Sequence, residues 1–385
     1  MFRAVLVLLT TVIALGLAEL VLRAIVRRAA ASPSHRYMTA DPVLHHRARA
    51  GVSTIVAGTP FSTSSLGLRD REYASPKPPS TFRILMLGDS FTEGGGLRLE
   101  QTVAKRVETA LNARGCGQYE VVNAGTASYS PILEYLRLQR LGPVLQPDLV
   151  VLNFDMTDVH DDLVRTATAV LDPRGLPLAV PSDPIRETAV VLPPPRWLGA
   201  VGRALNHLAL YQAIRKSGAG QWLLGPVKMT PEALVAYGLV GDVEHDPMAI
   251  TRDGDLPGLA RGWALTERYL VGIRDLVRAR GVPFVLVVYP HAQQVSADES
   301  PLGRRQLGAG PGLYASERPF ERLEALGRRE GFPVVNLLSV FRARRAEGPL
   351  FRTTDVHHTP GGAAVFADGV LAGLHGLDVL PPCRR

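Results

Sequence analysis

Apolar residues along the chain form short unbroken runs that alternate with longer stretches of helical spacing. The run from Phe82 to Leu87 stops at Gly88, which fits a strand buried on both faces. Apolar residues then recur four positions apart at Val103, Val107 and Leu111, which predicts a helix. The same pattern predicts strands at Tyr119–Asn123, Leu149–Leu152, Pro283–Tyr289 and Pro333–Leu338, and helices at 132–141, Trp263–Arg280, Phe320–Arg329 and Gly362–Leu374. Strands that alternate with helices predict an α/β fold with a doubly wound parallel sheet.

The alternation fails in two regions, and these regions divide the chain. Residues 32–80 are rich in Ser, Pro, His and Arg, lack periodicity and end in a proline-rich stretch, so we expect an irregular arm. Residues 163–261 are interrupted by repeated prolines, and only Trp197–Lys216 is predicted to be helical there. A structureless loop of that length is unusual inside a compact domain. We therefore expect an inserted cap there, between a first half of the α/β domain at 81–162 and a second half at 262–385.

Residues 1–31 are predicted to be a membrane anchor and its flank. The stretch Ala4–Leu22 is largely apolar and has one charged residue, Glu19, and as a helix it would cover close to the roughly 30 Å of a bilayer core. The alternative is a cleaved signal peptide with a small-residue site at Ala29-Ala30-Ala31. The length of the apolar run and the arginines that follow it, Arg23, Arg27 and Arg28, favour an uncleaved anchor.

Composition adds few constraints. The chain has 385 residues and a formal charge of +7, but its basic residues are mostly arginines scattered along the chain, which argues against a nucleic-acid partner. The two cysteines, Cys116 and Cys383, form no Cys-x-x-Cys pair, so the sequence predicts neither a zinc site nor dithiol chemistry. They could form a disulfide in an oxidising compartment or remain two thiols, and the sequence leaves both alternatives open.

Polar residues gather just after the predicted strands. Because ligands bind beyond the carboxyl ends of strands in an open parallel sheet, we expect these segments to converge on one edge. They are Gly88-Asp89-Ser90, Asn123-Ala124-Gly125, Asp155-Met156-Thr157-Asp158 and, before the last helix, Asp355-Val356-His357-His358. The residues His160, Asp161 and Asp162 have no metal-ligand spacing with the late histidines, so we interpret them as a solvated acidic loop and predict no metal.

Ser90, His357 and Asp355 are the residues that carry a candidate chemistry. A serine hydroxyl becomes a nucleophile when a base takes its proton, and a carboxylate that orients the base improves it. Backbone N–H groups at the turn of Ser90 could stabilise an oxyanion. His358 is the alternative base, but the spacing to the Pro and Gly residues that follow favours His357.

These motifs resemble the SGNH (GDSL-type) hydrolases, and most closely the membrane-anchored bacterial members, some of which act on acyl groups of cell-surface polysaccharides. The resemblance lies in Leu87–Gly94, in Gly125 and in Asp355–Gly362, and it covers about residues 82–160 and 283–374. It implies a flavodoxin-like three-layer fold and a Ser90–His357–Asp355 triad without a cofactor. It also implies oxyanion donors from the Ser90 backbone, from Gly125 and from a residue of the third block.

The third block departs from the family pattern. The family usually has Gly-x-Asn-Asp there, whereas this chain has Asp155-Met156-Thr157-Asp158, so that Thr157 stands at the asparagine position. Loss of one oxyanion donor costs roughly 3–4 kcal/mol of transition-state stabilisation. Either Thr157 substitutes for the asparagine, the cap supplies a donor, or activity is weak. Asn153 is nearby but lies on the predicted strand, which makes it a poorer candidate.

The predicted function is that of a serine esterase acting on acyl esters, O-acetyl groups among them, of a carbohydrate or another cell-envelope substrate through an acyl-Ser90 intermediate. One alternative is a polysaccharide O-acyltransferase that uses the same triad, and another is a catalytically weakened membrane-bound scaffold. The arginines after the anchor favour a cytoplasmic domain, whereas the resemblance favours export. We expect a single-pass protein of the bacterial inner membrane with an exported catalytic domain, and the sequence identifies no partner protein in the cell envelope.

Overall fold

The structure is a computed structural model that describes residues 37–182, 246–256, 258–303 and 314–383. The predicted anchor Ala4–Leu22 lies outside these residues, as does most of the predicted cap. Within the described ranges, no helix combines the length and the apolar character that a membrane span requires.

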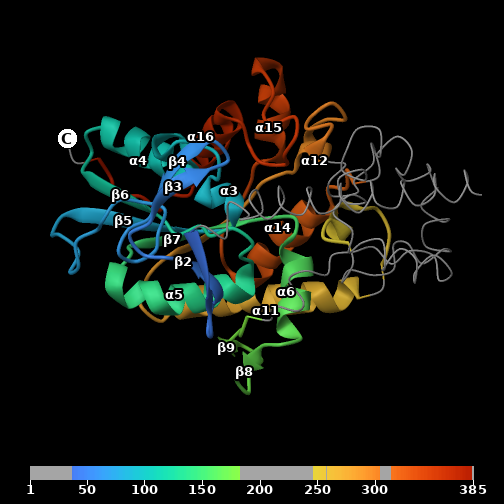
Figure 1. Cartoon of the computed structure of the whole chain (residues 1–385), viewed down its shortest axis with the longest axis horizontal. Helices are drawn as coiled ribbons and strands as arrows, with labels where there is room; N and C mark the ends of the chain where they lie inside the picture. The colour runs from blue at the N-terminus through green and yellow to red at the C-terminus, as the bar shows by residue number, and fades with distance from the viewer. Residues whose placement is uncertain (1–36, 183–245, 257, 304–313, 384–385) are drawn as a thin grey trace, which may run out of the picture. The chain divides into compact units, whose positions relative to one another are not determined.

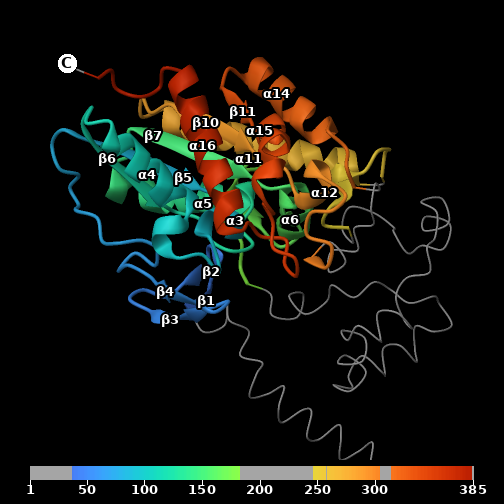
Figure 2. The same ribbon diagram turned by 90° about the horizontal axis from the view of Figure 1, so that it is seen from above.

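A five-stranded parallel sheet forms the centre of the domain. Its strands are β5 (Thr81–Leu87), β6 (Gln118–Asn123), β7 (Leu149–Phe154), β10 (Phe284–Val288) and β11 (Val334–Asn336). They follow one another across the sheet in the order β11-β10-β7-β5-β6, and each neighbouring pair is parallel (Figure 2). The predicted parallel sheet is thus confirmed, and all five predicted strands are present.

Helices cover both faces of the sheet and make three layers (Figure 1). On one face lie α4 (Val103–Ala113), α15 (Leu338–Arg344) and α16 (Pro360–Gly376). On the other lie α5 (Pro131–Leu145), α11 (Leu259–Arg278) and α14 (Arg318–Glu330). Successive side chains of a strand point to opposite faces, so Ile84 packs with the first group of helices and Leu85 with the second.

The strand order positions the candidate site. Numbered along the chain, the sheet has the order 2-1-3-4-5, in which the connections diverge between the first and third strands. Here those strands are β5 and β7, so the segments after Leu87 and after Phe154 flank the point where doubly wound folds bind their ligands. The short helix α3 (Ser90–Glu93) begins at this point.

The arm is more regular than its sequence predicts. It forms two hairpins, β1 (Met38–Asp41) with β2 (His45–Ala48) and β3 (Ser53–Val56) with β4 (Thr59–Ser62). The second hairpin turns at Ala57 and Gly58, both at positive φ, which matches the right-handed twist of its strands. Tyr37, Ala48, Val56 and Phe61 form a small apolar cluster between the hairpins. Strands of four residues give too short a pattern for sequence analysis to detect.

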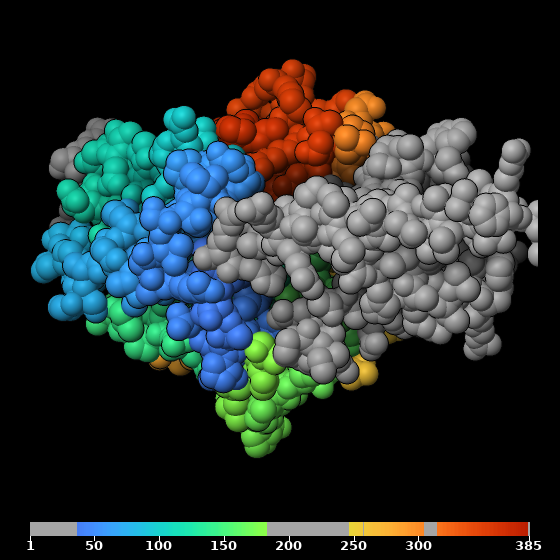
Figure 3. Space-filling view, in the orientation of Figure 1, coloured from blue at the N-terminus to red at the C-terminus, as the bar shows by residue number. Residues whose placement is uncertain are grey.

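Part of the predicted cap is described. It contains the last residues of α6 (Asp158–Thr166), which begins in the first half of the domain, a hairpin of β8 (Val170–Leu171) and β9 (Pro177–Ala179), and the 3₁₀ turn η2 (Ala249–Thr251). The hairpin projects at the lower edge of the view in Figure 3. The helix predicted at Trp197–Lys216 lies outside the described residues. The remaining short elements are η1 (Leu99–Gln101), α12 (Ala292–Val295) and η3 (Arg345–Glu347).

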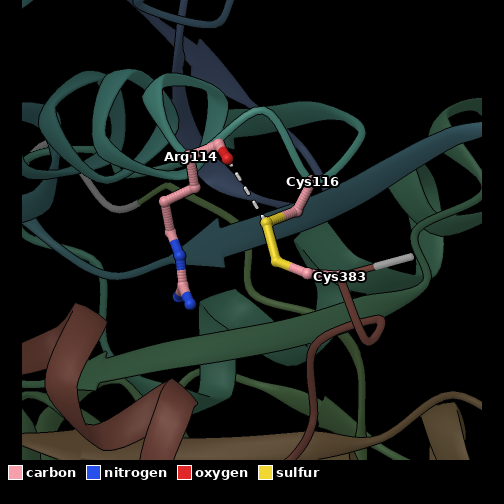
Figure 4. Close-up of a disulfide and its surroundings, with 3 residues drawn as sticks. All are labelled: Arg114, Cys116 and Cys383. Carbon is pink, nitrogen blue, oxygen red and sulfur yellow. Dashed lines mark hydrogen bonds between the residues drawn. A yellow bond between two sulfur atoms is a disulfide. The ribbon is translucent and has the colours of Figure 1, made fainter. Parts of the chain in front are cut away.

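The two cysteines form a disulfide (Figure 4). Cys116 follows α4 and Cys383 lies in the C-terminal tail, 267 residues later in the chain. The bond therefore joins the end of the chain to the first half of the α/β domain. Of the two alternatives that the sequence left open, the structure shows the paired one.

We expect reduction of this disulfide to lower the free energy of unfolding by about 2–4 kcal/mol, because the bond restricts the unfolded chain over a long loop. Urea unfolding with and without dithiothreitol measures the effect. The Cys383→Ser variant should unfold like the reduced protein and should not respond to the reductant. Equal unfolding midpoints for the oxidised, reduced and Cys383→Ser proteins would contradict a stabilising bond.

Candidate active site

Ser90 is presented by a tight turn at the end of β5. Gly88 has a φ of +151°, and a Cβ built there would lie 2.1 Å from Thr92 Oγ1, so a side chain is excluded. Asp89 caps the following helix, because its Oδ1 accepts a hydrogen bond of 2.9 Å from the Phe91 N–H. Ser90 is the first residue of α3, where a backbone N–H has no partner within the helix.

The late Asp–His segment reaches Ser90 from the turn before α16. His357 Nε2 lies 2.7 Å from Ser90 Oγ, and His357 Nδ1 lies 2.5 Å from Asp355 Oδ1. Two further hydrogen bonds fix the backbone of this segment. Ser300 Oγ donates to the Asp355 carbonyl, and the Arg352 N–H donates to the His357 carbonyl. Partial burial raises the pKa of Asp355, but the hydrogen bond and charge of His357 outweigh it, so that the pKa is lowered. The structure thus brings the three predicted triad residues into one hydrogen-bonded line.

His358, the alternative base, points elsewhere. Its ring is 3% exposed and packs against aromatic rings on every side, and neither nitrogen has a hydrogen-bond partner among the described residues. The surrounding rings belong to Phe91, Tyr289, Phe341, Phe351 and Phe366. Burial, with the charge of His357 as a second cause, lowers the pKa of His358 well below its usual value. His358 is therefore a neutral core residue in this structure.

This environment predicts a pH dependence of stability. In the unfolded chain a histidine takes up a proton below a pH of about 6.5, whereas buried His358 does not, so the unfolded state gains protons as the pH falls. His358 should make the protein less stable between pH 7 and pH 5, by up to about 1.4 kcal/mol per pH unit. Urea unfolding of wild type and His358→Leu at pH 7, 6 and 5 tests this. Parallel pH profiles for the two proteins would refute the assignment.

The predicted oxyanion donors are near the turn, but two of them already have partners. The Gly125 N–H donates to Asn123 Oδ1 at 3.1 Å. Thr157 donates to Asp155 Oδ1 twice, from its N–H at 2.8 Å and from its hydroxyl at 2.7 Å. Asn153, the other candidate, donates its side-chain amide to Thr92 Oγ1 at 2.9 Å. The assignment of Gly125 and Thr157 to an oxyanion hole therefore stays a prediction, and in this structure the proton of the Thr157 hydroxyl is directed at Asp155.

Gly125 has a separate steric reason to be glycine. A Cβ built on it would lie 2.3 Å from the Glu93 nitrogen and 2.7 Å from the Thr92 carbonyl carbon. The loop after β6 and the helix that begins with Ser90 therefore approach each other backbone to backbone.

The arm also contacts this region, which the sequence did not indicate. Tyr37 Oη donates to the buried Glu93 carboxylate at 2.9 Å, and the Arg69 guanidinium donates to the carbonyls of Glu93, Gly94 and Leu97. Burial raises the pKa of Glu93 to about 7, although Tyr37 and Arg69 oppose the shift. The arm thus contacts the C-terminal end of α3, the helix that begins with Ser90.

Sequence analysis also missed a second Asp–His pair. His291 Nε2 lies 2.7 Å from Asp155 Oδ2, and both side chains are buried. His291 lies three residues after the end of β10, so the same strand-end rule that singled out Ser90 and Asp155 could have found it.

Among the described residues, no group of His, Cys, Asp and Glu side chains is arranged to hold a metal ion. His160 contacts Asp161, while Asp162 accepts hydrogen bonds from the Ile132 N–H and the Thr266 hydroxyl. The interpretation of these residues as a solvated acidic loop is wrong, because they lie in α6, where His160 and Asp162 are buried and Asp162 bonds to residues of α5 and α11.

Comparisons with known proteins point to one family. Residues 253–380 match the family model of the SGNH hydrolase-like domain of acetyltransferase AlgX. This range includes Asp355 and His357 but not Ser90. No curated protein sequence matches the chain.

Solved structures give weak likenesses. LAE5, an α/β hydrolase from the metagenome of Lake Arreo in Spain, is 14% identical over 77% of this chain and 96% of its own, with a TM-score of 0.38. TesA is 14% identical over 77% of this chain and 99% of its own, with a TM-score of 0.39. A lipase/acylhydrolase from Enterococcus faecalis is 12% identical over 79% and 100%, with a TM-score of 0.39. Alignments this weak support no conclusion about the substrate.

The family match covers Asp355 and His357, and the triad geometry joins this segment to Ser90, which lies outside the match. Residues 253–380 thus match an SGNH hydrolase-like domain, and the Ser90–His357–Asp355 geometry is that of a serine hydrolase or acyltransferase.

Proposed function

We propose that the chain cleaves acyl esters, O-acetyl groups first among them, of a carbohydrate in the cell envelope through an acyl-Ser90 intermediate. The observation that carries the proposal is the position of His357, whose two nitrogens contact Ser90 Oγ at 2.7 Å and Asp355 at 2.5 Å. The matched family, that of acetyltransferase AlgX, supports acetyl as the acyl group.

The proposed steps follow from this line of contacts. His357 Nε2 takes the Ser90 proton as Oγ attacks the ester carbonyl, and Asp355 holds Nδ1–H and stabilises the imidazolium that forms. The same Nε2–H then protonates the leaving sugar oxygen, which releases the alcohol and leaves an acyl-serine. In the second half, His357 deprotonates the acceptor, whose oxygen attacks the acyl carbonyl, and the same proton returns to Ser90 Oγ as the acyl–Oγ bond breaks. Water gives hydrolysis, and a sugar hydroxyl gives transfer, so one triad serves both reactions.

A comparison of acceptors tests the reaction. The purified enzyme is given p-nitrophenyl acetate with and without an acetyl-accepting oligosaccharide, and free acetate and acetylated sugar are both measured. We expect p-nitrophenol release by wild type and none above background by Ser90→Ala, with Ser65→Ala, a change in an exposed serine of the arm, as the matched control. Equal release by wild type and Ser90→Ala would overturn the proposal.

A catalytically weakened binding or scaffold protein is the second candidate. It is favoured by the oxyanion site, where the Gly125 N–H and the Thr157 hydroxyl are occupied by Asn123 and Asp155. Thr157→Asn distinguishes the two candidates, because it restores the family's residue. A large gain of activity in Thr157→Asn over a nearly inactive wild type would favour the weakened protein.

We further propose that the catalytic domain is exported and tethered by the segment Ala4–Leu22. The Cys116–Cys383 disulfide supports export, since such bonds persist in oxidising compartments and are rare in the cytosol. Alkaline phosphatase fused after residue 80 should be active in cells. An inactive but expressed fusion would indicate a cytoplasmic domain, as the arginines after the segment suggest.

A further inference from the structure

The altered third block is the centre of a buried hydrogen-bond network. Asp155 stands where the family pattern has glycine, and its side chain accepts four hydrogen bonds. Oδ1 receives the N–H and the hydroxyl of Thr157 at 2.8 and 2.7 Å. Oδ2 receives the Tyr289 hydroxyl at 2.8 Å and His291 Nε2–H at 2.7 Å. A carboxylate with this many donors is used to capacity as an acceptor. The two departures from the family pattern, Asp155 and Thr157, are therefore hydrogen-bonded to each other and form one unit.

Electrostatics favour an ionised Asp155. Burial alone raises the pKa of its carboxyl, but the charge and hydrogen bond of His291, together with the donors from Thr157, lower it below the usual value. His291 lies on the neighbouring strand's end, since β10 pairs with β7 in the sheet. Its ring is 1% exposed, so its contact with Asp155 is shielded from solvent.

Tyr289 extends the network to the residue before Ser90. Its hydroxyl oxygen lies 2.8 Å from Asp155 Oδ2 and 3.1 Å from Asp89 Oδ1. The phenol has a single hydrogen, so two ionised carboxylates could not both be satisfied by it. Burial, and next the charge of Asp155, raise the pKa of Asp89 well above its usual value. A protonated Asp89 resolves the conflict, because each contact then has its own hydrogen.

Asp89 connects the network to the nucleophile. It caps α3 through the Phe91 N–H at 2.9 Å and lies 3.3 Å from Ser90 Oγ. Phe91, the next residue of the helix, packs against the rings of Tyr289, His291 and His357. The Asp355–His357 pair thus contacts Ser90 directly. The Asp155–His291 pair is connected to the same turn through Tyr289 and Asp89.

We propose that Asp155, His291 and Tyr289 are positioning residues that hold the Asp89 cap, and with it Ser90 Oγ, in line with His357. The inference rests on the proposed function, because it assigns these residues a task in acylation of Ser90. It explains why aspartate occupies a position where the family has glycine: the carboxylate ties the ends of β7 and β10 to the turn after β5.

Tyr289→Phe removes one hydroxyl and keeps the ring, so it tests the connection directly. We expect its kcat for p-nitrophenyl acetate, and its rate constant for labelling by a fluorophosphonate probe, to fall about 10-fold to 100-fold, with KM little changed, because small misplacements of a reacting group have effects of this order. The matched control is Tyr269→Phe, which also loses a buried hydroxyl, there bonded to Thr166 Oγ1 at 2.7 Å on α6. The control should label at the wild-type rate even if it melts at a lower temperature.

His291 supplies a second, independent variant. Glutamine can still donate a hydrogen bond to Asp155, whereas leucine cannot, so His291→Gln should retain more of the labelling rate than His291→Leu. If the residues act as one unit, Tyr289→Phe combined with His291→Gln should be little slower than the slower single variant.

The outcomes separate this inference from the proposed function. Labelling of wild type but not of Ser90→Ala supports the function, and slower labelling of folded Tyr289→Phe and His291→Leu then supports the positioning role. Wild-type labelling rates in both variants would overturn the positioning role and leave the function standing. Failure of wild type to label would overturn both.

Discussion

His357→Ala is expected to lower kcat/KM for acetyl esters by about 10⁴-fold to 10⁶-fold, because removal of one member of such a triad disables the rest. The physical reason is the single contact of 2.7 Å between His357 Nε2 and Ser90 Oγ, which gives the hydroxyl its base. Initial rates on p-nitrophenyl acetate measure the loss.

The matched control is His375→Ala, a change in an exposed histidine at the end of α16. It should keep wild-type activity. A His357→Ala enzyme with more than about a tenth of the wild-type kcat/KM would show that another base activates Ser90, since loss of a true triad base has a far larger effect.

Gly125→Ala is expected to have the next largest effect, on both activity and stability. The added Cβ would lie 2.3 Å from the Glu93 nitrogen, and because that atom belongs to the backbone of α3, the turn that carries Ser90 must shift. Overpacking of this kind costs roughly 1–3 kcal/mol of stability. A displacement of Ser90 by about 1 Å should lower kcat by at least about 10²-fold.

Thermal melting together with kcat checks this prediction. Gly95→Ala, at a glycine whose Cβ would meet nothing within 4 Å, is the control and should change neither quantity much. Wild-type kcat in a folded Gly125→Ala protein would mean that the close approach of the loop after β6 to α3 does not position Ser90.

The sequence predicted the sheet well because its signal is local. A strand such as β7 is buried along its whole length and therefore reads as an unbroken apolar run. The hairpins of the arm carry no such signal, since each strand has four residues and the turn places Ala57, a residue not typical of positive φ, at +47°. Their stability comes from packing around Tyr37 and Phe61, which only the folded chain brings together.

The candidate site likewise has residues that could be predicted from the sequence and residues that could not. Ser90 and the Asp355–His357 segment could be predicted because each has a local context, a strand end or a helix start, and the resemblance linked them. The strand-end rule could have pointed to His291, but its contact with Asp155 and Tyr289 could not be predicted, because it depends on β10 lying beside β7 in the sheet. The order of the strands in a sheet cannot be predicted from a single sequence. The hydrogen bond from the Thr157 hydroxyl to Asp155, two residues earlier, is local, but the sequence alone does not show which way the hydroxyl points.

The central claim is that Ser90 is a nucleophile activated by His357. The most direct measurement is mass spectrometry of the protein after reaction with a fluorophosphonate probe, followed by peptide mapping. We expect one adduct per chain, located on the peptide that contains Ser90. This adduct should be absent in both Ser90→Ala and His357→Ala. An adduct on another residue, or an undiminished adduct in His357→Ala, would contradict it.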